Sequence, residues 1–283
     1  MSPPSERLAI LQGLGAVAAG VGNNALIATL ATLPVLQIVL LRAGGAILIL
    51  LPVILWTGWR RPSLFSLLRA GVEASATLLL VFALVTTSLS LVATIMMAIP
   101  IGVMCGAALV LGERLSRTGQ VLVCVGFAGA AIATTPTFGG DLMGGAAALG
   151  SAALFVLRDL MTRRRREFVS ALEMSLTASL ITLVFALVAG GRHGWLPIDA
   201  ADMTVVAGMI VLYVASNLLI VAATRNGRPA LVATTRYSTV VWAMLVDILV
   251  FAHFPHPATL AGAALIIACG LGLMLTERRR PGA

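Results

Sequence analysis

The chain has 283 residues, of which 59% are apolar and only 11% are charged, and its mean hydropathy is +1.03. A soluble domain carries roughly a quarter charged residues, so most of this chain is expected inside a lipid bilayer. All 19 basic residues are arginine, which excludes nucleotide hydrolysis through a phosphate-loop lysine and chemistry through a lysine Schiff base.

Ten apolar runs follow one another, separated by charged residues or by turn-forming residues. A bilayer-spanning helix needs about 20 mostly apolar residues, so each run predicts one transmembrane helix. The predicted spans are residues 8–30, 34–56, 67–86, 90–111, 119–135, 142–161, 171–190, 203–223, 230–252 and 258–276. The net charge of +8 lies mainly between the runs. It therefore indicates contact with membrane lipid and gives no reason to expect a nucleic-acid partner.

The arginines predict the orientation of the spans. Fourteen of them fall in one alternate set of connections, and the other set holds only Arg192. Positive charge stays on the cytoplasmic side, so both termini are predicted to be cytoplasmic. A multi-pass protein of a bacterial inner membrane follows from this pattern.

The chain also contains an internal repeat. The tetrad Leu-Val-Ala-Thr occurs at 91–94 and again at 231–234, and other identities recur at the same offset of 140 residues. We therefore predict an all-α integral membrane protein of ten transmembrane helices, built as two five-helix repeats, residues 1–138 and 139–283. Because five is odd, the second repeat enters the membrane inverted, and inverted repeats are typical of secondary carriers.

Three places in the sequence resemble a known family. Arg42 follows Pro34 in the second span, and the fourth span ends in Gly-Glu-Arg-Leu-Ser at 112–116. The second half runs from the tetrad at 231–234 to Tyr237 and then through His253, Pro257, Gly262 and Gly270. Together these features resemble the EamA-type family of the drug/metabolite transporter superfamily, and within it the branch that exports aromatic and neutral amino acids. The resemblance implies ten helices in two inverted repeats, with a substrate site between them.

Polar residues deep inside the spans are the natural candidates for that site, because a charge at the bilayer centre costs at least about 2.5–3.5 kcal/mol. The offset of 140 residues relates Glu73 to Tyr213 and Thr77 to Asn217, so the same helix face is polar in both repeats. We expect the first, third, fourth, eighth and ninth spans to line the cavity. The candidate substrate-binding residues are Asn23, Asn24, Arg42, Glu73, Thr77, Tyr213, Asn217, Arg236, Tyr237, Ser238 and Trp242.

Other polar residues have a second interpretation as structural groups. Arg42 and Asp247 lie about 12 and 9 Å from the outer face, at 1.5 Å per helical residue, so they are predicted to pair, either in coupling or as a structural ion pair. Arg158 and Asp159 lie near the cytoplasmic boundary and are expected to be interfacial anchors. Pro100 interrupts the hydrogen bonding of the fourth span and is a candidate hinge.

No cofactor or metal is expected. The three cysteines, Cys105, Cys124 and Cys269, are widely spaced inside apolar runs, and the three histidines give no ligand pattern. No nucleophile lies beside a base, so the chain is predicted not to be an enzyme, and an intramembrane enzyme is the least favoured alternative.

The predicted function is that of a monomeric secondary transporter. It would export aromatic or neutral amino acids and related small metabolites by alternating access. The principal alternative is an importer or exchanger of a charged metabolite of the nucleotide, vitamin or carboxylate type.

Overall fold

The structure is a computed structural model that describes residues 3–57, 62–110, 117–134, 142–164, 171–190, 195–226 and 235–278. The predicted boundary between the repeats, at residues 138 and 139, and the second copy of the tetrad lie outside these residues. Within them, every regular element is an α-helix. The helices are α1 (Pro3–Thr29), α2 (Val35–Thr57), α3 (Leu64–Thr86), α4 (Leu89–Met96), α5 (Ile99–Val110), α6 (Arg117–Thr134), α7 (Leu142–Arg164), α8 (Ala171–Gly190), α9 (Ala200–Asn226), α11 (Ser238–Leu249) and α12 (Pro257–Arg278).

The described helices have the length and composition of membrane spans. Seven segments are long and apolar enough to cross a bilayer, and one of these combines α4 and α5 as Leu89–Val110. Three shorter apolar helices, Arg117–Ala133, Ser238–Leu249 and Pro257–Gly272, fall in the remaining predicted spans. Large apolar side chains such as Trp56 and Leu109 are 91% and 80% exposed. Such surfaces are suited to lipid and would be a liability in water.

The fourth predicted span is broken near its middle. Residues 97 and 98 form a turn between α4 and α5. Pro100 is the second residue of α5, where its missing N–H removes no intrahelical bond. The fourth span is therefore interrupted at residues 97–98, just before Pro100, and a hinge role for Pro100 stays a prediction. A similar turn at residues 236 and 237 precedes α11.

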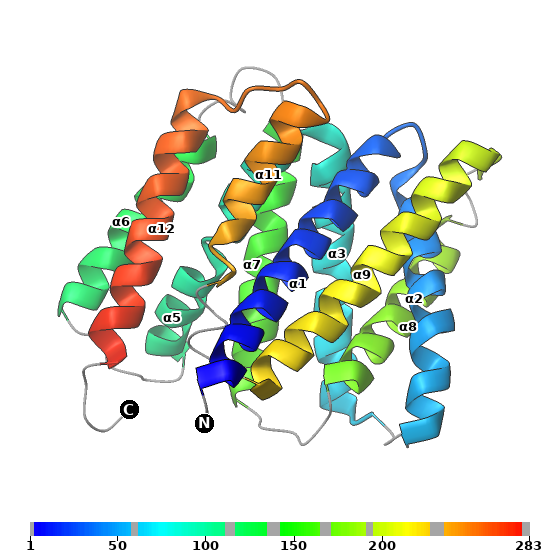
Figure 1. Cartoon of the computed structure of the whole chain (residues 1–283), viewed down its shortest axis with the longest axis horizontal. Helices are drawn as coiled ribbons and strands as arrows, with labels where there is room; N and C mark the ends of the chain where they lie inside the picture. Colours follow the sequence, from blue (N-terminus) through cyan, green and yellow to red (C-terminus); the bar gives the residue numbers. More distant parts are fainter. Residues whose placement is uncertain are drawn as a thin grey trace.

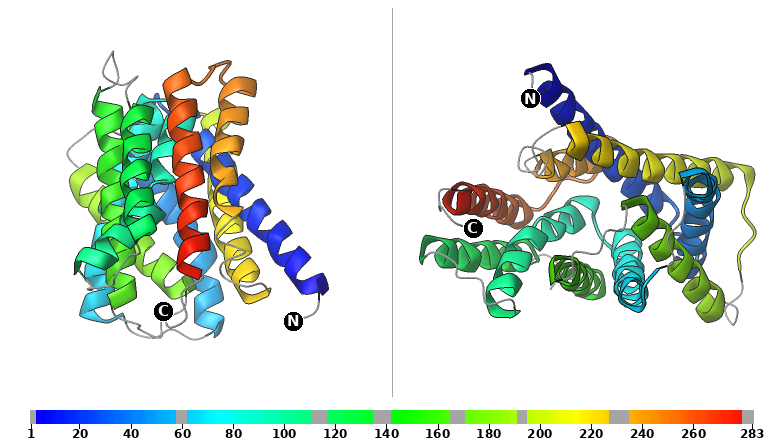
Figure 2. Two further views of the ribbon diagram at one scale, coloured as in Figure 1. Left: turned by 90° about the vertical axis from the view of Figure 1, so that its left-hand side faces the viewer. Right: turned by 90° about the horizontal axis from the view of Figure 1, so that it is seen from below.

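The helices pack mainly between the two halves of the chain. α1 packs on α9, α3 on α7, α2 on α8, and α6 on α12 (Figure 1). The α6–α12 pair stands at one edge of the bundle and the α2–α8 pair near the other, as the view from below also shows (Figure 2). The start of α1 and the end of α12 lie at the same end of the molecule (Figure 1).

Candidate functional site

A polar cavity of about 220 Å³ lies between α2, α3, α7, α8 and α9. The lining residues of α3, α8 and α9 lie near the middle of those helices, whereas those of α2 lie in its first half and those of α7 in its second half, so the cavity lies inside the bundle. Its lining residues are Val39, Arg42, Ala43, Glu73, Thr77, Phe155, Arg158, Ala178, Ser179, Thr182, Tyr213 and Asn217.

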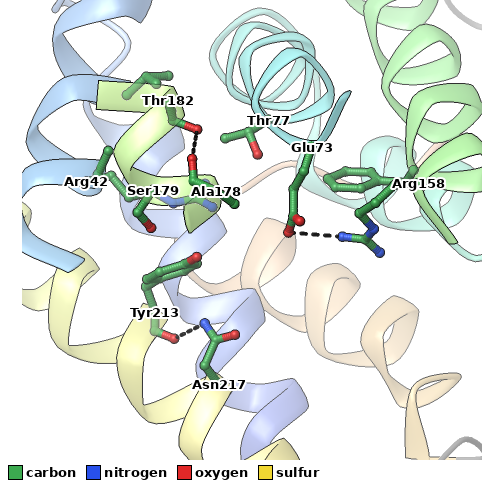
Figure 3. A pocket seen from close by; sticks show the side chains of 12 residues that line it. Arg42, Glu73, Thr77, Arg158, Ala178, Ser179, Thr182, Tyr213 and Asn217 are labelled. Atoms are coloured by element: carbon green, nitrogen blue, oxygen red, sulfur yellow. Dashed lines mark hydrogen bonds and ion pairs between the residues drawn. The ribbon is translucent and has the colours of Figure 1, made fainter. Parts of the chain in front are cut away.

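One wall of the cavity is charged (Figure 3). The Glu73 carboxylate accepts from Arg69 Nη1 at 3.0 Å and from Arg158 Nη1 at 3.3 Å, so each of its oxygens faces a guanidinium. Arg158 also binds Asp159 Oδ1 at 2.7 Å and covers the Phe155 ring at 4.7 Å. The network ties α3 to α7 and holds Glu73 at the cavity wall.

The opposite wall of the cavity holds Arg42, which contacts an aromatic ring and forms no ion pair with a described residue. The Arg42 guanidinium lies over the Tyr213 ring, 4.5 Å from its centroid. Among the described residues, no carboxylate pairs with Arg42. A cation above an aromatic face gains about 0.5–2 kcal/mol, and this contact leaves the N–H donors of the guanidinium available to an anion in the cavity.

Neutral polar groups complete the lining. Thr182 Oγ1 donates to the Ala178 carbonyl at 2.7 Å, and Asn217 Nδ2 donates to the Tyr213 carbonyl at 2.8 Å. The Asn217 amide oxygen is therefore left as an acceptor. Ser179 is also directed at the cavity (Figure 3). The site thus combines fixed charges with short hydroxyl and amide groups that can orient a small polar molecule.

The structure brings five of the predicted site residues into one cavity: Arg42, Glu73, Thr77, Tyr213 and Asn217. Four of these are the two pairs related by the offset of 140 residues. Only the third and eighth of the spans expected to line the cavity do so. The second, sixth and seventh spans form the rest of the wall, because α7 and α8 of the second half lie against α2 and α3 of the first.

Asn23 and Asn24 serve a contact between helices. Their side chains bond each other at 3.0 Å, and the Asn23 amide lies 3.1 Å from the Met209 carbonyl of α9. Asn23 is 4% exposed, so it is buried in the α1–α9 packing. The sequence left two roles open for these residues, a contact with a partner helix and a contact with substrate. The structure shows the contact with a partner helix, α9.

The polar cluster at the start of α11 also stands outside the cavity lining. Arg236 is an exposed turn residue, although it is close enough to Arg158 and Asp159 to feel their charges. Tyr237 is buried against Gly270 of α12, where any side chain would meet its ring, and Ser238 Oγ donates to the Thr235 carbonyl. Trp242 is 39% exposed.

The predicted pair of Arg42 and Asp247 is not formed. Arg42 faces Tyr213, whereas Asp247 Oδ2 accepts from the Ser90 backbone N–H at 2.7 Å. The prediction rested on depth along the bundle axis, and equal depth does not bring two helices together sideways. α2 packs on α8, α9 and α3, while α11 packs on α4 and α1.

The sequence did not predict that α7 and α8 line the cavity. Arg158 was expected to be an interfacial anchor, but Glu73 draws it to the cavity wall. Ser175, Ser179 and Thr182 follow the i, i+4, i+7 spacing of one helix face, and this signal could have identified α8 as a lining helix.

In the described part of the chain, no cluster of three or more His, Cys, Asp or Glu side chains suits a metal.

The fold and the cavity define a multi-pass helical membrane protein with a deep polar site. Residues 7–135 match the model of the EamA-like transporter family, as the sequence resemblance predicted, whereas the aromatic and neutral amino acid exporter branch stays a prediction. Over this part, slightly less than half of its length, the chain is similar to the EamA-like transporter family, whose members are membrane transporters.

Two further comparisons concern the fold and known relatives. A solved chain titled "Crystal structure of protein" is 18% identical, with a TM-score of 0.64, and the match covers 96% of this chain and 98% of that one. At this identity the likeness shows the fold alone. No curated protein matches the chain by sequence.

Proposed function

We propose that the chain is a secondary carrier that exports aromatic or neutral amino acids and related small metabolites across a bacterial inner membrane. The observation that carries this proposal is the mid-bundle cavity, in which an arginine without a carboxylate partner faces a charged wall. At about 220 Å³, the cavity is smaller than the roughly 300–1,000 Å³ of sites for drug-sized ligands. A small metabolite fits this size.

The chemistry of the walls suits a zwitterion. A substrate carboxylate would take the free N–H donors of Arg42, because guanidinium and carboxylate bind through parallel hydrogen bonds. The substrate ammonium would find the Asn217 amide oxygen and the Ser179 hydroxyl, with Glu73 lowering the local potential. The Tyr213 ring offers an apolar face for a side chain.

We further propose that residues 1–138 and 139–283 form two inverted repeats of five spans, with both termini in the cytoplasm. In this scheme α1 corresponds to α7, and α3 corresponds to α9. The α1–α9 contact of one repeat arrangement therefore corresponds to the α7–α3 contact of the other, and both contacts are present. Turns at residues 97–98 and 236–237 occupy nearly matching places in the two halves. The ends of α1 and α12 on one side of the molecule (Figure 1) and the arginine pattern also support this topology.

Alternating access follows from this architecture as a proposal. The cavity lies between helices of both repeats, so rocking one repeat against the other would expose it to each side in turn. The turns that precede α5 and α11, beside the α4–α11 contact, give the bundle a place to bend.

The second candidate is an exchanger of an anionic metabolite. Among the described residues, Arg69 and Arg158 form ion pairs with Glu73 and Asp159, and Arg42 adds a positive charge that no ion pair balances. The excess of positive charge would favour a substrate with a net negative charge, such as a carboxylate or a phosphate ester.

Counterflow in proteoliposomes tests the proposal and separates the two candidates. Vesicles preloaded with unlabelled phenylalanine, threonine or methionine receive the same labelled amino acid outside. We expect uptake that depends on the internal amino acid, that Arg42→Gln weakens, and that Arg117→Gln at the exposed start of α6 leaves unchanged. Counterflow of dicarboxylates or nucleotides, with none for amino acids, would favour the exchanger. No counterflow for either panel by folded protein would refute a carrier.

A further inference from the structure

A second ionisable group inside the bundle lies away from the cavity. Asp247 of α11 is 2% exposed, and its Oδ2 accepts from the Ser90 backbone N–H at 2.7 Å. Ser90 is in the first turn of α4, where backbone N–H groups lack intrahelical partners and favour negative charge. This hydrogen bond joins α4 to α11, two residues before α11 ends at Leu249.

Asp247 has no cationic partner among the described residues. α4 carries no ionisable side chain, and the charged residues of α1, Glu6 and Arg7, lie in its first turns at the opposite end of the molecule (Figure 1). Arg236 lies in the turn before α11, eleven residues before Asp247 and at the other end of that helix. The nearby titratable groups are His253 and His256 of the following loop. Both are exposed, and the His253 backbone N–H donates to the Asp247 carbonyl at 2.8 Å.

Two hydroxyl groups of α4 beside this contact are buried without a hydrogen bond. Ser90 and Thr94 are both 0% exposed, and neither Ser90 Oγ nor Thr94 Oγ1 has a partner. An unsatisfied buried polar group costs about 1–3 kcal/mol and needs an explanation. A carboxylic acid has one O–H donor that a carboxylate lacks, and Ser90 Oγ stands on the residue that already holds Asp247. The Ser90 backbone N–H stabilises the charged form of Asp247, and a protonated Asp247 would reach the unpaired Ser90 hydroxyl only after the contact shifts, because no hydrogen bond joins the two groups in this structure.

We propose that Asp247 is a proton-binding site that couples a proton to the transport cycle. This inference rests on the proposed carrier function. In the charged form, the carboxylate caps the amino end of α4 and holds α11 against it. A proton that arrives from the outer side binds the free carboxylate oxygen, removes the negative charge that faces the amino end of α4 and so weakens the cap. Release of the proton on the cytoplasmic side restores the contact, so one proton moves inward as one substrate moves outward.

The test uses the full-length protein in liposomes with an acidic interior. Labelled phenylalanine, threonine or methionine, whichever supports counterflow, is added outside. Wild type is expected to accumulate it by up to about tenfold per unit of pH difference for one proton per substrate. Asp247→Asn should abolish accumulation while its counterflow at equal pH stays within about twofold of wild type, the range of a neutral substitution. Asp202→Asn, in the first turn of α9, is the matched control and should behave as wild type.

Accumulation by Asp247→Asn equal to that of wild type would overturn the inference. So would wild-type counterflow that ignores the pH gradient, although the carrier function would then stand. If Asp247→Asn does not fold, Asp247→Glu must shift the pH at which uptake is half-maximal, and an unchanged profile refutes coupling. Infrared difference spectra between acidic and alkaline pH provide a readout that needs no substrate. A carboxylic-acid band present in wild type and lost in Asp247→Asn supports the site, and identical spectra overturn it.

Discussion

Two helix contacts that pair the halves of the molecule, α1 with α9 and α3 with α7, differ in their chemistry. Along α1–α9, a Cβ added at Gly20 would lie 3.2 Å from Ser216 Oγ, and one added at Gly22 would lie 3.0 Å from Leu212. Ser216 Oγ donates to the Ala16 carbonyl across this contact at 2.8 Å. Small residues allow the two helices to approach closely, which is how membrane helices gain van der Waals contact.

The α3–α7 contact has two parts. In the half nearer the end of α3, it resembles α1–α9, because Ser151 Oγ donates to the Ala76 carbonyl at 2.8 Å. In the other half it carries the network of Arg69, Glu73 and Arg158. When two helices separate, charged groups can replace their ion pairs with hydrogen bonds to water. A close-packed apolar contact gains no such replacement when it opens. If the bundle moves during transport, the difference predicts movement at the charged half of α3–α7 and a fixed contact at α1–α9.

The largest effect is expected from Glu73→Gln, which removes the carboxylate shared by Arg69 and Arg158. Breaking a fully buried ion pair costs about 3–5 kcal/mol. Because the Glu73 side chain is 22% exposed, we expect on the order of 2–3 kcal/mol less stability. Thermal unfolding in detergent measures it. Adding Arg158→Gln should restore part of the loss, and an unchanged melting temperature for Glu73→Gln would contradict the importance of the network.

Arg42→Gln should alter substrate affinity and leave stability nearly unchanged, because Arg42 belongs to neither contact. Losing a charged hydrogen bond costs about 1.5–3 kcal/mol, or roughly 10- to 100-fold in KM. Transport kinetics at varied substrate concentration give the value, with Arg42→Lys expected to fall between wild type and Arg42→Gln. A KM within experimental error of wild type would remove Arg42 from the site.

Gly22→Leu tests the fixed contact. Overpacking costs about 1–3 kcal/mol, offset by a gain of about 1 kcal/mol in helix propensity, so a net loss of about 1–2 kcal/mol is expected in thermal unfolding. Gly71→Leu is the matched control, because no atom lies within 4 Å of a Cβ added there. Equal stabilities for the two variants would show that α1–α9 is not closely packed.

The smallest effect is expected at Tyr213. Tyr213→Phe keeps the ring under Arg42 and loses only the hydroxyl that is 3.4 Å from Ser175 Oγ, so KM should change by at most about twofold. Tyr213→Leu removes the cation–π contact, worth about 0.5–1 kcal/mol, and should raise KM a few-fold. The reverse order would point to the hydroxyl as the binding group.

The positions of the helices could be predicted because lipid imposes a length and a polarity on each span. The pairing of Glu73 with Tyr213, and of Thr77 with Asn217, was recoverable from the internal repeat, and all four line the cavity. Lateral neighbours were not recoverable, since hydropathy fixes depth and leaves rotation and packing partners open. This is why the pairing of Arg42 with Asp247 was predicted wrongly and why Arg158 was assigned to the interface.

Site-directed thiol labelling tests alternating access to this cavity most directly. Ser179→Cys, in a variant without Cys105, Cys124 and Cys269, places one thiol in the lining. We predict that an impermeant reagent labels it from either side of the membrane, one side at a time, and that the amino acid identified by counterflow protects it. A thiol that never reacts from either side, or whose labelling ignores every transported amino acid, would contradict the account.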